Sequence, residues 1–188
     1  IGEHYILQRY NGTGAGYTSG WPDINAGPVD GMIRTETDMQ WLQAMIDAGY
    51  SFNGVKTLSP DTLWYGDFIY ADANGDNNYG NEDDKNFNGH SSTPSYNLGI
   101  NLGFSWKGLD FSMQWVGAFD YYIYWASSYY NDTTISWGYA ISERIANDHY
   151  FYDPANPDDL RTNINATYPR LYKGDTRNKE TSDFYEYK

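Results

Sequence analysis

Hydrophobic and polar residues alternate along two consecutive runs between residues 95 and 117, with Val116 as the one exception. Side chains along a strand point alternately to opposite faces, so each run predicts a strand with one apolar face and one polar or glycine face. Lys107 and Gly108 separate the two runs and predict a two-residue hairpin turn. The apolar positions are Leu98, Ile100, Leu102, Phe104, Trp106, Leu109, Phe111, Met113 and Trp115.

Two kinds of protein show such a hairpin. In a transmembrane barrel the apolar face meets lipid, the polar face meets the lumen and the periplasmic turn is short. In a soluble antiparallel sheet the apolar face packs on a core. Trp106 beside the turn and Trp115 near the far end occupy the positions of aromatic girdles. Together with the small polar face, these tryptophans favour a transmembrane β-hairpin over 95–117.

The segments on both sides of the hairpin are long and mostly irregular. Residues 1–94 are expected to form an extracellular loop region, with a short helix at 37–48 capped by Thr37 with Gln40 and ended by Gly49. A short strand is expected at 66–71. Residues 118–188 are expected to form a long extracellular loop with one helical turn at 141–146, leading to the next strand. The fold class is therefore all-β, a fragment of an antiparallel barrel with long loops and one short helix.

Composition limits the classes of function that the sequence can be expected to have. The chain carries 25 acidic and 12 basic residues, a net charge of -13, which argues against a nucleic-acid partner. It has no cysteine, which rules out disulfides and thiol catalysis. The chain has 20 tyrosines and 7 tryptophans, residues that suit membrane interfaces and sugar-stacking surfaces. A tyrosine-rich run follows the hairpin and comprises Tyr121, Tyr122, Tyr124, Tyr129 and Tyr130. His4, His90 and His149 are scattered, and no catalytic set is found, so we do not expect an enzyme.

One acidic segment has the spacing of a calcium loop. Counted from Asp72, it places oxygen-bearing residues at loop positions 1, 3, 5, 7 and 12, which are Asp72, Asn74, Asp76, Asn78 and Asp83. Side-chain oxygens at positions 1, 3 and 5 converge on a hard cation, position 7 offers its carbonyl, and position 12 closes the shell. Position 6 is Asn77 instead of glycine, and position 12 is Asp instead of Glu. Without a metal, the same residues would form a solvated cluster of Asx turns.

The order of motifs resembles a known family. The segment GDFIYADANGD, its continuation to a P-x-Y, a G-x-N strand and a K-G turn, and a strand that matches the family's F-D-x-S-x pattern at Asp110 and Ser112 are similar to the late barrel of SusC/RagA-type TonB-dependent transporters. Segments VDGMIRTETDMQWLQ and NINATYPRL resemble two further family segments, so the similarity covers about residues 28–115 and 163–188. The matching central positions are Gly66, Asp67, Tyr70, Asp72, Asn74, Gly75, Asp76, Asp84, Gly89, Pro94, Tyr96, Gly99, Asn101, Lys107, Gly108, Asp110 and Ser112.

The resemblance implies part of a plugged barrel in the outer membrane of a Gram-negative bacterium. Such a transporter imports oligosaccharide or peptide nutrients, is capped by a SusD-like surface lipoprotein and draws energy from TonB. The family's signal peptide, N-terminal domain, TonB box, plug and last aromatic strand have no counterpart in these residues, so we expect this chain to be a segment of a longer protein. Two alternatives stay open: a soluble secreted calcium-dependent glycan-binding β-module, and a fragment of an extracellular glycoside hydrolase.

Overall fold

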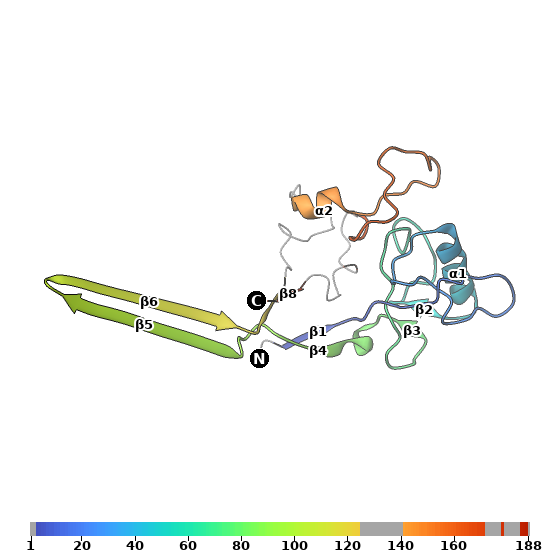
Figure 1. Ribbon diagram of the computed structural model, residues 1–188. Helices are drawn as coiled ribbons and strands as arrows, with labels where there is room; N and C mark the ends of the chain where they lie inside the picture. The colour runs from blue at the N-terminus through green and yellow to red at the C-terminus, as the bar shows by residue number, and fades with distance from the viewer. Residues whose placement is uncertain (1–2, 125–140, 172–177, 179–184, 188) are drawn as a thin grey trace. The chain divides into compact units, whose positions relative to one another are not determined.

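The computed structural model describes residues 3–124, 141–171, 178 and 185–187, and strand residues outnumber helical ones (Figure 1). The chain divides into two units. The hairpin unit comprises Ile1–His4, Phe87–Tyr124 and Tyr185–Lys188, and the helical unit comprises Tyr5–Asn86 and Trp125–Phe184. The β-rich class expected from sequence is confirmed at this level. Within the described ranges, no helix has the length and apolar character needed to cross a membrane.

The hairpin unit is built on the two longest strands, β5 (Tyr96–Trp106) and β6 (Leu109–Phe119), which pair antiparallel (Figure 1). Lys107 and Gly108 form the turn, with φ of 50° and 84°. Positive φ at both central residues belongs to the hairpin turn whose twist matches that of the flanking strands. The hairpin predicted over 95–117 is confirmed, and its second strand extends two residues further.

The register gathers the apolar side chains on one face of the hairpin. Ile100 lies opposite Trp115 and Phe104 opposite Phe111, whose ring is stacked at a centroid distance of 5.2 Å. From Leu98 to Trp106 the apolar residues of β5 are 41–63% exposed. On the other face, polar residues pair across the strands, including the hydrogen bond from the Ser105 hydroxyl to the Asp110 carboxylate. Within the hairpin unit, no described residue therefore covers the apolar face.

Short strands make up the other sheets. β1 (Glu3–Ile6) pairs with β4 (Asn86–Ser91). β7 (Tyr122–Tyr124) pairs antiparallel with β8 (Tyr185–Tyr187). In the helical unit, β2 (Ser51–Phe52) pairs in parallel with β3 (Asn78–Tyr79). Tyr129 and Tyr130 of the tyrosine-rich run lie outside the described residues.

The helical unit contains α1 (Glu36–Asp47), the short α2 (Glu143–Asn147) and the 3-10 turn η1 (Glu82–Asp84). The helix predicted at 37–48 is confirmed within one residue, but its predicted cap is wrong. Thr35, not Thr37, is extended and caps α1: its hydroxyl accepts from the Asp38 amide at 3.2 Å, and Asp38 accepts from the Thr35 amide at 2.9 Å. Aspartate thus fills the place expected for Gln40.

The core of the helical unit lies under α1. Met39, Trp41, Leu42 and Met45 are buried along one side of the helix, as their helical spacing predicts. Trp41 donates its indole N–H to the Asp23 carbonyl at 2.8 Å. A Cβ on Gly27 would lie 2.6 Å from the Trp41 ring, so only glycine permits this close approach.

The strand predicted at 66–71 is wrong. Instead of a ladder, this segment makes two isolated bridges, Met32 with Phe68 and Arg9 with Tyr70. The Phe68 amide donates to the Asn178 side chain at 2.9 Å, which replaces a partner strand at that point. Phe68, Ile69 and Tyr70 are all buried, so the apolar run belongs to the core although it is not a regular strand.

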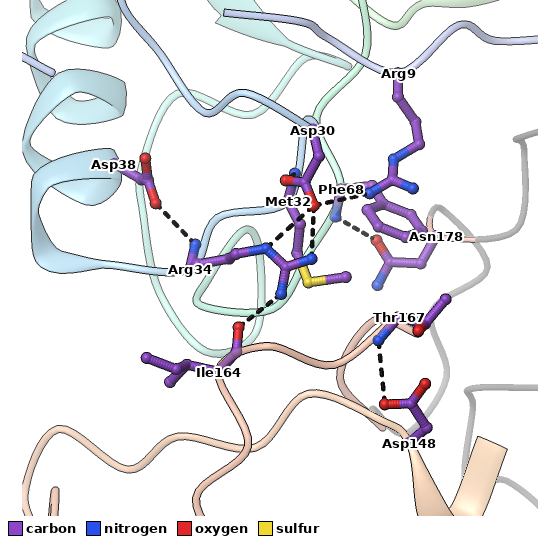
Figure 2. Close-up of polar contacts among 10 residues, drawn as sticks. All are labelled: Arg9, Asp30, Met32, Arg34, Asp38, Phe68, Asp148, Ile164, Thr167 and Asn178. Carbon is purple, nitrogen blue, oxygen red and sulfur yellow. Dashed lines mark hydrogen bonds and ion pairs between the residues drawn. The ribbon is translucent and has the colours of Figure 1, made fainter. Parts of the chain in front are cut away.

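Arginine side chains join parts of the helical unit that are far apart in sequence (Figure 2). Arg34 donates to the Asp30 carboxylate at 2.6 Å and, through its other terminal nitrogen, to the Ile164 carbonyl at 2.6 Å. Burial acts to raise the pKa of Asp30, but the hydrogen bonds from Arg34 and Met32 and the nearby arginines outweigh it and lower the pKa. Arg9 approaches the same carboxylate at 3.6 Å.

One of the two deeply buried carboxylates of the helical unit is that of Asp67, which is 2% exposed. Arg170 donates to both of its oxygens, at 2.7 and 2.8 Å, in the bidentate geometry that makes such pairs strong. Asn178 donates to one oxygen at 2.9 Å and the Trp64 amide donates to the other at 2.8 Å. The carboxylate is therefore fully hydrogen-bonded by groups from three segments of the chain.

We expect Arg170→Met to destabilise the helical unit by about 3–5 kcal/mol, because it leaves the buried Asp67 carboxylate without its counter-charge. Urea unfolding followed by tryptophan fluorescence measures the change. Arg161→Met is the matched control: Arg161 also pairs with an aspartate, Asp159 at 2.8 Å, but its side chain is 71% exposed. The control should leave the unfolding midpoint almost unchanged, and equal losses in both variants would contradict the role assigned to Asp67.

Candidate functional site

The loop predicted to bind calcium is ordered by its own carboxylates. The Asp72 carboxylate accepts the amides of Gly75 at 2.7 Å and Asn77 at 2.9 Å. The Asn74 side-chain oxygen accepts the Asp76 amide at 2.9 Å. Asn77 has a φ of 66°, so asparagine takes the left-handed conformation that glycine usually provides at this position. The loop thus turns sharply without its expected glycine.

Asp76 lies between neighbours that keep it ionised. Its carboxylate accepts the Asn78 amide at 2.8 Å and the side-chain amides of Asn81 at 2.8 Å and Asn74 at 3.2 Å. The backbone hydrogen bond from Asn78, together with these side-chain bonds, lowers the pKa of Asp76 below its usual value. An exposed, ionised carboxylate is the oxygen donor that Ca²⁺ prefers.

Asp84, which is not among the five predicted calcium ligands, closes the loop. Asp84 is 1% exposed, and its carboxylate accepts four backbone amides: Ala73 and Asn74 on one oxygen at 2.7 and 3.2 Å, and Gly80 and Asn81 on the other at 2.7 and 3.2 Å. It also completes the capping box of η1 with Asn81. The cap spacing N-x-x-D from Asn81 to Asp84 is the sequence signal that could have identified it.

The five predicted ligands are therefore not equivalent. Asp72, Asn74 and Asp76 lie within one hydrogen-bonded loop, which suits positions 1, 3 and 5 of a calcium site. The Asn78 side-chain oxygen accepts a hydrogen bond from the Ser51 hydroxyl at 2.8 Å. The ligand that a calcium loop requires at this position is the backbone carbonyl, not the side chain. Asp83 is exposed. Within the described ranges, no three His, Cys, Asp or Glu side chains converge on a metal position.

The donor chemistry still fits a hard cation. Carboxylate and amide oxygens are the preferred ligands of Ca²⁺, and each oxygen that accepts one amide keeps a second lone pair. Calcium at Asp72, Asn74, Asp76, Asn78 and Asp83 stays a prediction. His149, the histidine whose side chain is described, bonds through Nδ1 to the carbonyls of Ile145 and Ala146, at 3.1 and 2.9 Å.

The second candidate site is a groove beside α1, with a volume of about 920 Å³. One wall is the exposed face of α1, where Glu36, Gln40, Gln43 and Asp47 follow one another at helical spacing. The rest of the lining includes Trp21, which is 72% exposed, together with Tyr17, Leu58, Trp64 and Tyr65. The sequence analysis missed this groove, because its aromatic residues come from two segments that are separate in sequence from each other and from α1.

Hydrogen bonds orient the Glu36 side chain at the N-terminal end of α1. Its carboxylate accepts the Tyr65 hydroxyl and the Gln40 side-chain amide, the latter at 3.3 Å. Burial, followed by this hydrogen bond with Glu36, raises the pKa of Tyr65. At the other end, Gln43 donates to Asp47 at 2.8 Å. The two carboxylates are therefore oriented on the helix surface.

Comparison with known proteins found no matching family model, no matching curated protein and no matching solved structure.

We expect Asp84→Asn to destabilise the helical unit by about 1–3 kcal/mol, because the introduced amide group would face buried backbone N–H donors. Loss of slow hydrogen exchange at the Gly80 and Asn81 amides, measured by NMR, locates the effect. Asp83→Asn is the control, since this neighbouring aspartate is exposed and should change stability by less than about 0.5 kcal/mol. Retained protection in Asp84→Asn would refute the closing role of Asp84.

Proposed function

We propose that this chain forms part of a TonB-dependent outer-membrane importer of oligosaccharides or peptides. In this proposal β5 and β6 belong to the wall of the transmembrane barrel, and the helical unit belongs to its extracellular loops. A SusD-like lipoprotein would cap the transporter, and TonB would act through parts of the protein outside this chain. The motifs that resemble the SusC/RagA-type family support the proposal.

The apolar face of the hairpin, which no described residue of the hairpin unit covers, is the observation that carries it. Each strand has eleven residues, which at about 3.4 Å per residue extend roughly 37 Å. At a tilt of about 45°, the strands would span roughly 26 Å of membrane, close to the ~25 Å apolar band of outer-membrane barrels. The length, the two-residue turn and the separation of apolar and polar faces all fit this location.

A soluble module would need to bury the same face. In a β-sandwich, a second sheet packs about 10 Å above the first and covers its apolar side chains. The apolar residues of β5 and β6 instead form a continuous exposed stripe, and a stripe of this size favours an interaction with lipid or protein. This contrast favours the importer over the glycan-binding module.

The calcium loop would have a structural role in this proposal. Calcium at the Asp72–Asp83 loop would neutralise neighbouring carboxylates and hold the backbone in one geometry, which preorganises the adjoining extracellular surface. The hydrogen bonds to Asp72 and Asp84 already set much of that geometry. Calcium removal should therefore loosen the loop and leave the hairpin intact.

Site-directed labelling tests the barrel assignment, since the chain has no cysteine of its own. In outer membranes that contain the full transporter, spin labels at Leu98→Cys, Leu102→Cys and Leu109→Cys should collide with oxygen and be shielded from a water-soluble nickel complex. Labels at Asn97→Cys, Asn101→Cys and Gln114→Cys serve as matched controls on the other face. They should be shielded from oxygen relative to the first set and accessible to nickel, because lumenal and lipid-facing residues alternate.

A period of two residues in these accessibilities is the expected result. Equal nickel access on both faces would place the hairpin in water. Shielding of the apolar set from both reagents would place it in a protein core. Either outcome would contradict the importer proposal.

Calcium titration of the chain tests the metal prediction. We expect binding with a dissociation constant of about 10⁻⁴–10⁻³ M, the range of extracellular calcium modules, and slower hydrogen exchange at the Gly75 and Asn77 amides. Asp72→Asn and Asp76→Asn should weaken binding about tenfold or more, because each removes a charged ligand.

Glu82→Gln is the control for this titration, since its side chain is 85% exposed and outside the predicted ligand set. Asp83→Asn tests the closing ligand separately. The absence of calcium-dependent exchange at the loop amides, with the hairpin amides unchanged, would reject the metal site and leave the barrel assignment untouched.

A further inference from the structure

A separate pocket of about 560 Å³ lies within the helical unit. Its walls come from residues 64–65, from the stretch 146–152 that begins in α2, and from the stretch 161–171. Its volume lies in the range of sites that bind small molecules. It shares Trp64 and Tyr65 with the groove beside α1 and no residue with the acidic loop.

The charge of the lining sets this pocket apart from the rest of the chain. Apart from tyrosine, the ionisable residues that are described in its lining are Arg161, Arg170 and His149, and none of them is an aspartate or glutamate. The chain as a whole has a net charge of -13, and the groove beside α1 is lined by Glu36 and Asp47 without a basic residue. The pocket is therefore the place where an acidic chain offers hydrogen-bond donors to an anion.

Arg161 has N–H groups left for a ligand. Its guanidinium carbon lies 4.4 Å from the centre of the Phe151 ring, and Nε and one terminal nitrogen donate to Asp159 at 3.0 and 2.8 Å. A guanidinium has more N–H groups than this pair uses. Within the described part of the chain, its second terminal nitrogen has no hydrogen-bond partner. The ring covers one face of the guanidinium and leaves its edge to bind a carboxylate.

The aspartates around the pocket limit the charge of the ligand. Arg170 is bound by Asp67 through two hydrogen bonds, as Arg161 is bound by Asp159. Each arginine is thus already neutralised by one carboxylate, and the adjoining hollow of about 480 Å³ contains Asp153. A dianion such as a phosphate ester would be repelled by these aspartates more strongly than a carboxylate with a single charge.

Aromatic side chains make up much of the remaining wall. Trp64 and Tyr65 meet edge to face at a centroid distance of 5.3 Å and an angle of 84°. Tyr65 and Tyr152 do so at 5.2 Å and 71°. Phe151 adds a fourth ring to the lining. Aromatic rings gain from offset and edge-to-face contacts with one another, so these walls favour a flat aromatic ligand over a saturated one.

We propose that this pocket binds a small aromatic monocarboxylate. The carboxylate accepts hydrogen bonds from Arg161, and the aromatic ring of the ligand packs against Phe151 and Tyr152. The proposal does not rest on the importer assignment or on calcium, because every residue that carries it lies in the helical unit and outside the acidic loop.

Four related compounds test the class of ligand against the whole chain by saturation-transfer difference NMR at pH 7.5. The probe is 2-naphthoate. The neutral 2-naphthamide keeps its ring, decahydro-2-naphthoate keeps its charge, and 2-naphthyl phosphate carries a second charge. We expect 2-naphthoate to bind with a dissociation constant of about 1 mM or lower. The other three compounds should bind at least about threefold more weakly, because each lacks one of the matched features.

Substitutions locate the binding. Arg161→Met should weaken 2-naphthoate about threefold or more and remove the preference for the acid over the amide. Arg144→Met is the matched control, since Arg144 is also exposed and lies 5.1 Å from the Tyr168 ring but does not line the pocket. It should leave the affinity unchanged. Tyr152→Leu should remove the preference for 2-naphthoate over its saturated analogue. The urea unfolding midpoint confirms that each variant is folded.

The opposite results overturn the proposal. Equal affinity for 2-naphthoate and 2-naphthamide would show that the pocket does not recognise the carboxylate, and tighter binding of the phosphate would assign it to a dianion. Equal losses in Arg161→Met and Arg144→Met would show general attraction to basic side chains. The absence of saturation transfer to 2-naphthoate at about 10 mM would reject the site outright. Each of these results would leave the hairpin labelling and the calcium titration unaffected.

Discussion

The helical unit depends on a buried carboxylate that needs partners from distant parts of the chain. Asp67 is bound by Arg170 and Asn178, which follow the hairpin in sequence, and by the Trp64 amide, which precedes it. Such a charge is tolerated in the interior only when its hydrogen bonds are all made. These hydrogen bonds hold the 64–70 segment beside Arg170 and Asn178. The acidic loop follows this segment directly in the sequence.

In several loops, aspartate carboxylates accept hydrogen bonds from backbone amides. Asp72 and Asp84 accept amides in the acidic loop, and Asp38 does so at the start of α1. Loops without regular ladders must satisfy their buried polar groups in some other way. The aspartate and asparagine content of this chain supplies those acceptors. Exposed carboxylates of the acidic loop, such as Asp76 and Asp83, make the surface acidic, which links the folding of this loop to the calcium binding proposed for it.

The hairpin shows the opposite arrangement. It has a regular ladder and almost no packed side chains, since its apolar stripe faces outward. A two-stranded ribbon is only marginally stable by itself in water. Its register and separated faces agree with the barrel location proposed above, in which one face meets lipid and the other meets water.

The sequence alone determined the local features. Strict alternation predicted β5 and β6, the Lys107–Gly108 turn followed from its length, and α1 was predicted within one residue, because these depend on neighbours in the chain. The tertiary structure decided the rest. It showed that 66–71 is buried without being a strand, that Thr35 caps α1, and that Asp84 closes the acidic loop. It also brought Trp21, Trp64 and the face of α1 to one groove. These features depend on which distant groups satisfy a buried polar atom, and such pairings leave no periodic signal in the sequence.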